Sequence, residues 1–202
     1  MENKPYISRK EQAQMTKKKI FDVTMVMLRK KNYNKIIIRE ICQSAQISVG
    51  TFYLYFSSKD EILLENFRNI DARLLPLEKG NYLSAPQRIC QYFYNYLKEI
   101  ANMFDKELMR EICRINLFSG KNEFLKENLR LYTFILECIQ EEADHLQLTT
   151  DLSVTEICIQ IHLFVQSYIY QWVIDNDLSA DYLTVTAIEN LQKYLSLFFQ
   201  EN

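Results

Sequence analysis

The residues with the most specific potential chemistry lie between Ile37 and Phe67. Val49, Gly50, Thr51 and Tyr53 would stand near the start of a short helix, where a helix-turn-helix presents its residues to base edges in the major groove of DNA. Contacts to base edges carry the sequence information in protein–DNA recognition. The segment therefore predicts a DNA-reading site.

Two very short helices and a tight turn would position these residues. The first helix is expected from Ile38 to Ala45, with Ile38, Ile41 and Cys42 on its buried face at helical spacing. The turn is only Ala45-Gln46-Ile47. The second helix would begin after Ser48, whose hydroxyl can accept a hydrogen bond from a first-turn backbone N–H.

Composition favours a soluble all-helical protein. Of the 202 residues, 48% are hydrophobic and 25% charged, and only three glycines and three prolines are present. Such a chain is built more easily from helices than from many hairpins. No apolar run reaches the ~18 residues of a membrane helix, and the N-terminus lacks a signal-peptide core. We therefore expect no membrane contact and a cytoplasmic location.

The cysteines and histidines do not form a recognisable chemical site. The five cysteines, Cys42, Cys90, Cys113, Cys138 and Cys158, are scattered without a C-x-x-C pair, and the histidines are His145 and His162. This pattern is typical of buried apolar cysteines, not of disulfides or zinc ligands. We expect no metal, no cofactor and no catalytic residues.

The net charge of −2 conceals an asymmetry along the chain. Residues 1–60 carry 12 basic and 5 acidic side chains, whereas residues 61–202 carry 12 basic and 21 acidic ones. A basic N-terminal part on an acidic remainder fits a phosphate-binding head joined to a body that avoids nucleic acid. Individual lysines are also explained as members of solvated helix faces.

Capping signals and apolar spacing predict nine helices and no convincing strand. Capping boxes begin at Ser8, Ser58, Ser84 and Ser153, each with an acid or amide three residues later. The first two helices are expected at about residues 8–31 and 38–45, and the third begins after Ser48. The others are expected at about residues 59–77, 84–100, 106–118, 123–146, 153–174 and 181–199.

The N-terminal segment closely resembles the TetR family of bacterial transcriptional regulators. The resemblance extends over about fifty residues and is densest in the run ISVGTFYLYFSSKDEIL, from Ile47 to Leu63. Upstream it includes Ile20, Val23, Leu28, Tyr33, Arg39-Glu40-Ile41 and Ala45. The C-terminal two thirds matches the family only in helix number, length and the amphipathic character of the last two helices.

The resemblance implies an all-α fold with two parts. Residues 1–58 would form a three-helix DNA-binding domain with the helix-turn-helix. Residues 59–202 would form a ligand-binding and dimerisation domain, linked through the helix from 59 to about 77. The DNA-binding residues it implies are Arg39, Ser48, Val49, Gly50, Thr51, Tyr53, Tyr55 and Lys59.

Each implied role suits the chemistry of its residue. The hydroxyls of Ser48, Thr51 and Tyr53 would contact phosphates or base edges, and Tyr55 stands where the family commonly has a backbone-contacting histidine. Lys59, at a helix N-terminus, would attract phosphate. Gly50 would let the backbone approach the groove. Phe52 and Phe56 are assigned to the core.

Three positions depart from the family pattern. Ile36 and Ile37 replace threonines, one of which caps the second helix, so this helix would begin without a side-chain cap. Gln46 replaces the turn glycine and would be strained if its φ is positive. Asn32 replaces another glycine and suits a left-handed helix end.

The resemblance also implies a mechanism. A homodimer would bind a palindromic operator as a repressor, and a small, largely apolar effector in the C-terminal domain would release it. The expected dimer contacts are Phe164, Tyr168, Trp172, Leu191, Leu195 and Phe198. The expected ligand contacts are Tyr92, Phe93, Tyr96, Phe104, Met109, Asn116, Phe134, His162, Gln166 and Tyr170. Packing within one subunit is the alternative explanation for both groups.

Two other functional classes remain open from the sequence. A TetR-like adaptor or co-regulator would bind a protein partner through its C-terminal domain and would have an exposed apolar patch instead of a pocket. An enzyme would need a cleft that gathers His162, a cysteine and an acid.

Overall fold

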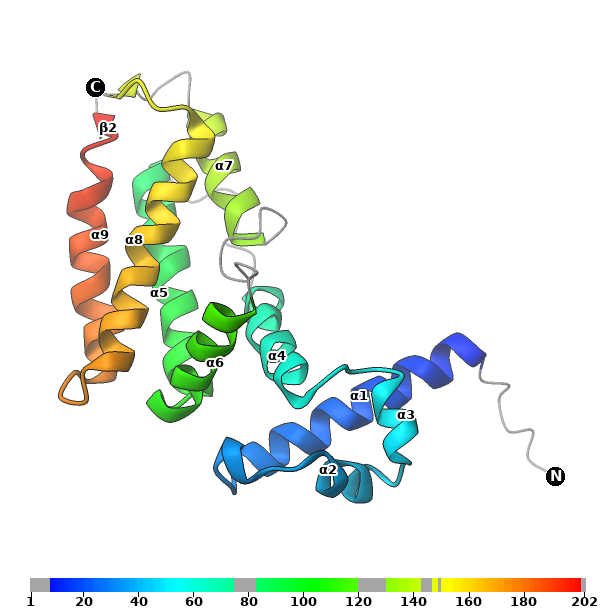
Figure 1. The fold of residues 1–202 in the computed structure, drawn as a ribbon. Helices are drawn as coiled ribbons and strands as arrows, with labels where there is room; N and C mark the ends of the chain where they lie inside the picture. Colours follow the sequence, from blue (N-terminus) through cyan, green and yellow to red (C-terminus); the bar gives the residue numbers. More distant parts are fainter. Residues whose placement is uncertain (1–7, 75–82, 120–129, 143–146, 149, 201–202) are drawn as a thin grey trace. The chain divides into compact units, whose positions relative to one another are not determined.

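The computed structural model describes residues 8–74, 83–119, 130–142, 147–148 and 150–200 (Figure 1). Helices dominate these residues, so the predicted all-α class is confirmed. The chain divides into two compact units, Met1–Glu65 and Asn66–Asn202, which we call the head and the body. The division lies inside a helix, so each unit receives one half of it.

The head contains three complete helices and the first half of a fourth. In chain order its elements are α1 (Arg9–Leu28), the 3-10 helix η1 (Tyr33–Lys35), α2 (Ile38–Ala45), α3 (Val49–Tyr53) and the start of α4 (Lys59–Arg73). The predicted bounds of α2 are confirmed. The capping box at Ser8 is also present, since Ser8 and Glu11 each accept a hydrogen bond from the other's backbone N–H.

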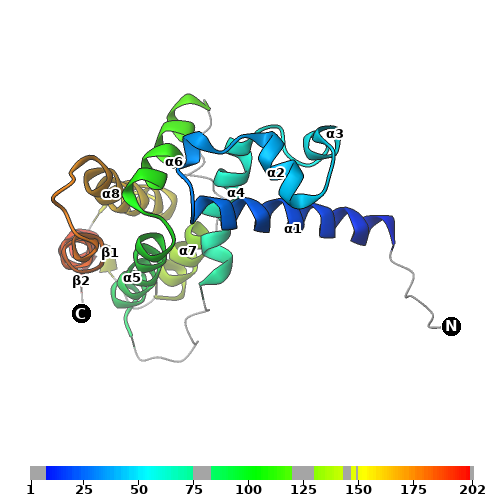
Figure 2. The ribbon, with the colours of Figure 1, turned by 90° about the horizontal axis from the view of Figure 1, so that it is seen from below.

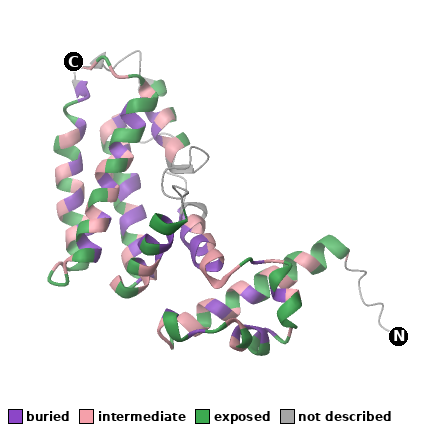
Figure 3. Ribbon diagram, viewed as in Figure 1, coloured by how far each residue is buried: buried purple, intermediate pink, exposed green. Residues whose placement is uncertain are grey.

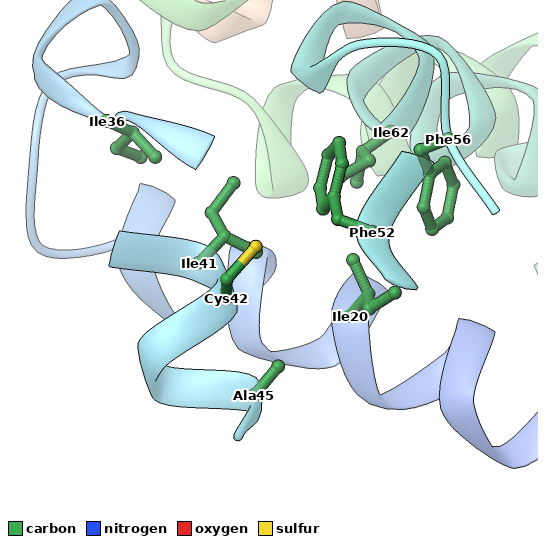
Figure 4. Close-up of a cluster of buried hydrophobic side chains, with 8 residues drawn as sticks. All are labelled: Ile20, Ile36, Ile41, Cys42, Ala45, Phe52, Phe56 and Ile62. Atoms are coloured by element: carbon green, nitrogen blue, oxygen red, sulfur yellow. The ribbon is translucent and has the colours of Figure 1, made fainter. Parts of the chain in front are cut away.

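A compact apolar cluster holds the head together (Figure 4). Its eight buried members come from every helix of the head and from the loop before α2: Ile20, Ile36, Ile41, Cys42, Ala45, Phe52, Phe56 and Ile62. Phe52 and Phe56 have ring centroids 6.1 Å apart. Because both are almost fully buried, they attach α3 and the segment after it to α1 and α2.

The turn between α2 and α3 closes through paired backbone hydrogen bonds. Ile47 N–H donates to the Cys42 carbonyl at 3.0 Å, and Gln46 N–H donates to the Gln43 carbonyl at 3.1 Å. This is the Schellman pattern, which requires a left-handed residue after the helix. Gln46 has a φ of 54°, the only positive φ recorded among the described non-glycine residues.

The other two departures from the family pattern, at Ile37 and Asn32, differ in whether the structure agrees with the prediction. Ile37 provides no side-chain cap to α2, as predicted, but the Glu40 carboxylate accepts a hydrogen bond from the Ile37 N–H at 3.4 Å. The left-handed conformation predicted for Asn32 is wrong, because its φ is −52°. Its side chain instead accepts a hydrogen bond from the Asn34 N–H and caps η1.

Lys59 connects the start of α4 to η1. Its ammonium donates to the backbone carbonyls of Tyr33 and Ile36, both at 3.0 Å, and lies 4.2 Å from the centre of the Tyr33 ring. The Tyr33 hydroxyl donates to the Asp60 carboxylate. We call these contacts of Lys59 the Lys59 clamp. It binds carbonyl groups at the first residue of η1 and just after η1.

The body is a bundle of helices that receives the second half of α4. Its other elements are α5 (Ala85–Met103), α6 (Lys106–Phe118), α7 (Arg130–Glu142), α8 (Val154–Ile174), the π-helix η2 (Tyr182–Thr186) and α9 (Ala187–Leu195). Helix α8 contacts α6, α7 and α9, and α5 contacts α7 and α9. Figure 2 looks along several of these helices and shows them side by side.

Several predicted boundaries in the body need correction. Helix α4 ends at Arg73, and α9 ends at Leu195 instead of continuing to Phe199. The strands β1 (Gln147–Leu148) and β2 (Phe199–Gln200), which we did not predict, form a short antiparallel pair with Leu148 opposite Phe199. The predicted start and end of the helix at 123–146 lie outside the described residues.

Figure 3 marks buried residues along the helices of the body. Helix α5 buries residues at three- and four-residue spacing, including Ile89, Phe93, Leu97 and Ile100. The end of α8 is held by cations from α6: Lys106 donates to the Asp175 carbonyl at 2.6 Å, and Arg110 Nε donates to the Val173 carbonyl at 2.9 Å. Positive groups at a helix C-terminus are favourable because its carbonyls carry partial negative charge.

Helix α8 is long and apolar enough to cross a membrane by length and composition alone, although polar residues interrupt its apolar sequence. It is the one such helix among the described residues, and 44% of its apolar window is buried. Since it also contacts three helices of the body, the packing is that of a core helix.

The left-handed turn generates a stability prediction. Glycine tolerates positive φ without the Cβ clash, which costs other residues about 1–2 kcal/mol. We expect Gln46→Gly to raise the free energy of unfolding by about 1 kcal/mol in urea titrations. The control Gln43→Gly, inside α2, should lower it by a similar amount. A loss of stability in Gln46→Gly would contradict this account.

The Lys59 clamp generates a second prediction. Lys59→Met keeps the aliphatic stem but removes the charged donor, whose hydrogen bonds are worth about 1.5–3 kcal/mol. We expect amide hydrogen exchange in α2 and η1 to accelerate accordingly. Lys35→Met, at an exposed lysine of η1, is the control. Equal exchange rates in the two variants would show that the clamp contributes nothing.

Candidate nucleic-acid interface

Helix α3 presents one exposed face. Val49, Tyr53 and Leu54 are 42%, 54% and 80% exposed, whereas Phe52 is fully buried on the opposite side. Gly50 is exposed beside Val49. Residues four apart on a helix share a face, so Val49, Gly50, Tyr53 and Leu54 form a single surface. Leu54 was missed from the sequence, although its spacing from Gly50 placed it on this face.

The hydroxyl groups at the start of α3 bind one another. Ser48 Oγ accepts a hydrogen bond from the Thr51 N–H at 2.9 Å, as predicted for a cap, and lies 2.8 Å from Thr51 Oγ1. A hydroxyl has one donor and two acceptor positions. The pair therefore retains hydrogen-bonding capacity while being held in a fixed orientation.

The remaining predicted DNA contacts are placed differently from one another. Arg39 is exposed on α2. Tyr55 is half-buried and packs against the apolar cluster of the head. The Lys59 ammonium is occupied by the carbonyls of Tyr33 and Ile36, so its charge is used inside the head. Its contact with phosphate stays a prediction.

Gly50 has no structural requirement for glycine. A Cβ built on it would meet only Ser48 Oγ, at an ordinary contact distance of 3.7 Å, and its φ is not in the left-handed range. A glycine inside a helix is less favourable than alanine by roughly 0.5–1 kcal/mol. The missing side chain is therefore useful only to something that approaches α3 from outside.

Part of the positive charge of the head is neutralised internally. Lys17 pairs with Glu65 and Lys31 pairs with Glu40, both at 2.8 Å. The Lys31 contact and the Ile37 N–H lower the pKa of the Glu40 carboxyl. Other basic residues are exposed: Arg9, Lys10, Lys19, Arg29, Lys30, Lys35 and Arg39.

The predicted ligand residues lie in the body and pack mainly against one another. Phe93, Phe104 and Met109 are at most 1% exposed. Tyr92 stacks on Phe134 with ring centroids 4.5 Å apart, and Tyr96 is also buried. His162, Gln166 and Tyr170 are half-buried on α8. The aromatic members of the group serve as core residues.

The one buried polar residue of that group already has a partner. Asn116 on α6 is 8% exposed and forms a side-chain hydrogen bond with Tyr170 on α8, which favours the ionised phenol. Burial outweighs this hydrogen bond and, together with nearby Cys113, raises the pKa of Tyr170. The Asn116–Tyr170 pair thus joins two helices of the body.

A cavity of about 540 Å³ lies elsewhere in the body. It is lined by Ser84, Pro86, Gln87, Cys90, Gln192, Ser196 and Phe199. None of the ten predicted ligand residues lines it. The sequence predicted a helix cap at Ser84 and Gln87 but not that these residues line a cavity. The end of α9, which forms the opposite wall, is distant in the chain.

Four of the six predicted dimer contacts are buried within the subunit. Leu191 and Leu195 are fully buried, and Trp172 and Phe198 are 4% and 7% exposed. This corrects their assignment to an interface, since their side chains fill the core of the body. Phe164 and Tyr168 are half-buried, and Phe164 stacks on Tyr194 at 4.3 Å. The apolar residues exposed on α8 and near α9 are Ile159, Leu163, Ile174, Val185 and Leu197.

No group of three or more His, Cys, Asp or Glu side chains within the described ranges could hold a metal ion. The cysteines there are free, and all except the half-buried Cys90 are buried. Burial raises the pKa of Cys113 to about 12 and that of Cys158 to about 11. These thiols are therefore protonated at neutral pH, and thiolate chemistry is disfavoured.

Sequence comparison identifies relatives of the head. The family described as "Bacterial regulatory proteins, tetR family" matches residues 20–65. The HTH-type transcriptional regulator Mb0790c of Mycobacterium bovis is 31% identical over 83 residues, which cover 41% of this chain and 38% of that protein. The HTH-type transcriptional repressor KstR of Rhodococcus jostii is 34% identical over 61 residues, 28% of this chain and 29% of its own. The chain thus spans well under half the length of these relatives.

Structure comparison extends the likeness to the whole fold. The TetR-family repressor FadR of Thermus thermophilus, solved in complex with lauroyl-CoA, matches with a TM-score of 0.60 and 22% identity, over 90% of this chain and 92% of its own. At this identity the match shows a shared fold. The TetR family model thus matches a segment of the head, and the described helices share the fold of a solved TetR-family repressor.

Proposed function

We propose that this protein is a DNA-binding transcriptional repressor that acts as a homodimer on a palindromic operator and is released by a small molecule bound in the body. The family consists of regulators and not of enzymes, so the catalytic alternative has no support. We also propose that the protein acts in the cytoplasm, where its DNA target is accessible.

The observation that carries the proposal is the exposed, sterically unexplained Gly50 on α3. A Cβ added at this position would meet no backbone or apolar neighbour within the head. The exposed neighbours Val49 and Tyr53 lie on the same face of the helix. Close approach to a ligand surface is one of the reasons for glycine in regular structure. A base edge or phosphate group in the major groove would need this space.

The charge distribution also supports DNA as the partner. The exposed basic residues named above belong to the head, whereas residues 61–202 carry nine more acidic than basic side chains. Phosphate contacts supply most of the sequence-independent affinity for DNA. An acidic body would limit contact with DNA to the head.

The dimer surface proposed for this chain lies on α8 and α9. Ile159, Leu163 and Leu197 are 37%, 43% and 64% exposed, beside the half-buried stack of Phe164 and Tyr194. Interfaces are enriched in aromatic and apolar residues at their centre. These exposed residues replace the buried leucines of the original prediction.

Coupling between ligand and DNA is proposed to pass through α4. Its first half belongs to the head, where Ile62 joins the apolar cluster, and its second half belongs to the body, where Phe67 lies 6.3 Å from Phe104. An effector that favours one position of α4 would shift the population of DNA-binding states. The adaptor alternative predicted a body without a pocket. The cavity of about 540 Å³ therefore supports regulation by a small molecule.

The Gly50 argument is tested by Gly50→Ala. We expect the free energy of unfolding to remain equal or to rise by up to about 1 kcal/mol, while affinity for a duplex selected by the wild-type protein from a random pool falls about tenfold or more. Gln14→Ala, on the exposed side of α1, should change neither. Undiminished DNA affinity in Gly50→Ala would refute the proposed role of α3.

The phosphate contribution is tested by salt titration. If the two heads of a dimer together make at least six phosphate contacts, affinity should fall roughly 10³-fold between about 50 and 200 mM salt because counterions are released. Fluorescence anisotropy with the selected duplex measures the slope. An affinity for the duplex that does not change with salt would show that the basic residues of the head do not bind phosphate.

A further inference from the structure

The exposed face of α3 is largely apolar. Val49 and Tyr53 of α3 and Leu54 directly after it are 42%, 54% and 80% exposed, and Gly50 lies beside them. Val49 and Tyr53 are four residues apart, as are Gly50 and Leu54, so these residues adjoin on one side of the helix. Single exposed apolar residues are common in soluble proteins, whereas a contiguous apolar surface marks a site of contact.

This face carries none of the side chains that read guanine, adenine or cytosine through paired or charged hydrogen bonds. Arginine or lysine reads guanine, asparagine or glutamine reads adenine, and aspartate or glutamate accepts a hydrogen bond from cytosine. The residues from Ser48 to Leu54 are Ser-Val-Gly-Thr-Phe-Tyr-Leu, with no amide, guanidinium, ammonium or carboxylate side chain among them. These three modes of base recognition are therefore not open to α3.

The hydroxyl groups of α3 discriminate poorly between bases. Ser48 Oγ accepts a hydrogen bond from the Thr51 N–H at 2.9 Å and lies 2.8 Å from Thr51 Oγ1. The pair thus uses part of its hydrogen-bonding capacity internally. Its remaining positions offer single contacts, and a hydroxyl both donates and accepts, so it suits more than one base.

The base feature that an apolar side chain recognises is the C5 methyl group of thymine. In the major groove this methyl distinguishes thymine from the other bases, and apolar side chains contact it directly. Removing the methyl and the side chain together from water is favourable, whereas a polar base edge placed against hydrocarbon loses its hydration. Val49 and Leu54 carry only hydrocarbon side chains. The missing side chain at Gly50, which adjoins both, leaves space for a methyl group to approach.

The core of the head holds these apolar side chains in fixed positions. Phe52, between Val49 and Leu54 in the chain, is fully buried, and its ring lies edge-on to that of Tyr53 with centroids 5.4 Å apart. The Leu54 N–H donates to the Thr51 carbonyl at 3.3 Å, which continues the helical turn. A contact surface that is already ordered loses little conformational freedom on binding. A small methyl contact can therefore contribute its full effect to affinity.

From these features we propose that Val49 and Leu54 read the C5 methyl groups of thymine, so that the operator carries T·A pairs opposite the exposed face of α3. This inference rests on the proposed function, because it takes α3 to be the element in the major groove. It adds which base is recognised and which side chains recognise it. Base preference then comes from apolar contact, while phosphate contacts of the basic head add affinity without base preference.

Deoxyuridine tests the methyl contact on the unaltered protein, because it keeps every hydrogen-bonding group of thymidine and lacks only the methyl. The duplex selected by the wild-type protein is prepared with each thymine in turn replaced by deoxyuridine, and affinity is measured by fluorescence anisotropy. We expect affinity to fall about fourfold at one or more positions, the effect of burying one methyl group. Equal affinity for the thymine and deoxyuridine duplexes at every position would overturn the proposal.

Truncation of the two side chains locates the contact. We expect Val49→Ala and Leu54→Ala each to abolish the preference for thymine over deoxyuridine at a position where the wild-type protein shows it, because side chain and methyl act as one interacting pair. Val26→Ala is the matched control: Val26 on α1 is 51% exposed and undergoes the same truncation, so every preference should remain. Preferences that persist in both α3 variants would assign the methyl effect to other residues or to DNA flexibility and refute the proposal.

The same measurements separate this inference from the proposed function. Duplex binding by the wild-type protein without any thymine preference would leave the DNA-binding regulator in place and remove only the methyl contact. If the protein selects no duplex from the random pool, both proposals fall, and the apolar face of α3 then suits a protein partner. The deoxyuridine series needs no substitution in the protein, so it decides the outcome even where the urea midpoint of a variant shows that it has failed to fold.

Discussion

The burial of Phe52 is the constraint on which the exposed face of α3 depends. Helix α3 has only five residues, and so short a helix is unstable in isolation because nucleation is costly. Phe52 fixes α3 to the apolar cluster, and the Ser48–Thr51 contacts complete its first turn. The exposed face is therefore a property of the whole head: each helix of the head contributes to the cluster that holds α3.

Polar contacts to backbone carbonyls perform a related task in both units. Lys59 binds two carbonyls in the head, and Lys106 and Arg110 bind the carbonyls at the end of α8 in the body. In each case a long cationic side chain from one helix donates to backbone carbonyls at or near the end of another element. Positive charge in this chain thus has structural uses as well as a use in attracting phosphate.

Local signals made the head predictable, and long-range packing limited the prediction of the body. The bounds of α2 and the Ser48 cap follow from neighbouring residues. Whether Leu191 faces a partner or the core depends on which side of α9 meets α5, which a single amphipathic pattern does not specify. The cavity was equally unpredictable from local sequence, because Ser84 and Ser196 come together only in the folded bundle. The contacts of Lys59 within the head were not predicted because the carbonyls it binds lie more than twenty residues earlier.

The position of the unit boundary within α4 has a consequence for isolating the head as a fragment. A fragment ending at residue 58, before α4, would lose Lys59 and Ile62 and leave the apolar cluster open on one side. One ending at Glu65 would retain both and the Lys17 ion pair, but only about two turns of a helix that continues to Arg73. A stable isolated head therefore needs residues of α4 that belong to the body. The two units are distinguished by their internal contacts, but no single cleavage point in the chain separates them.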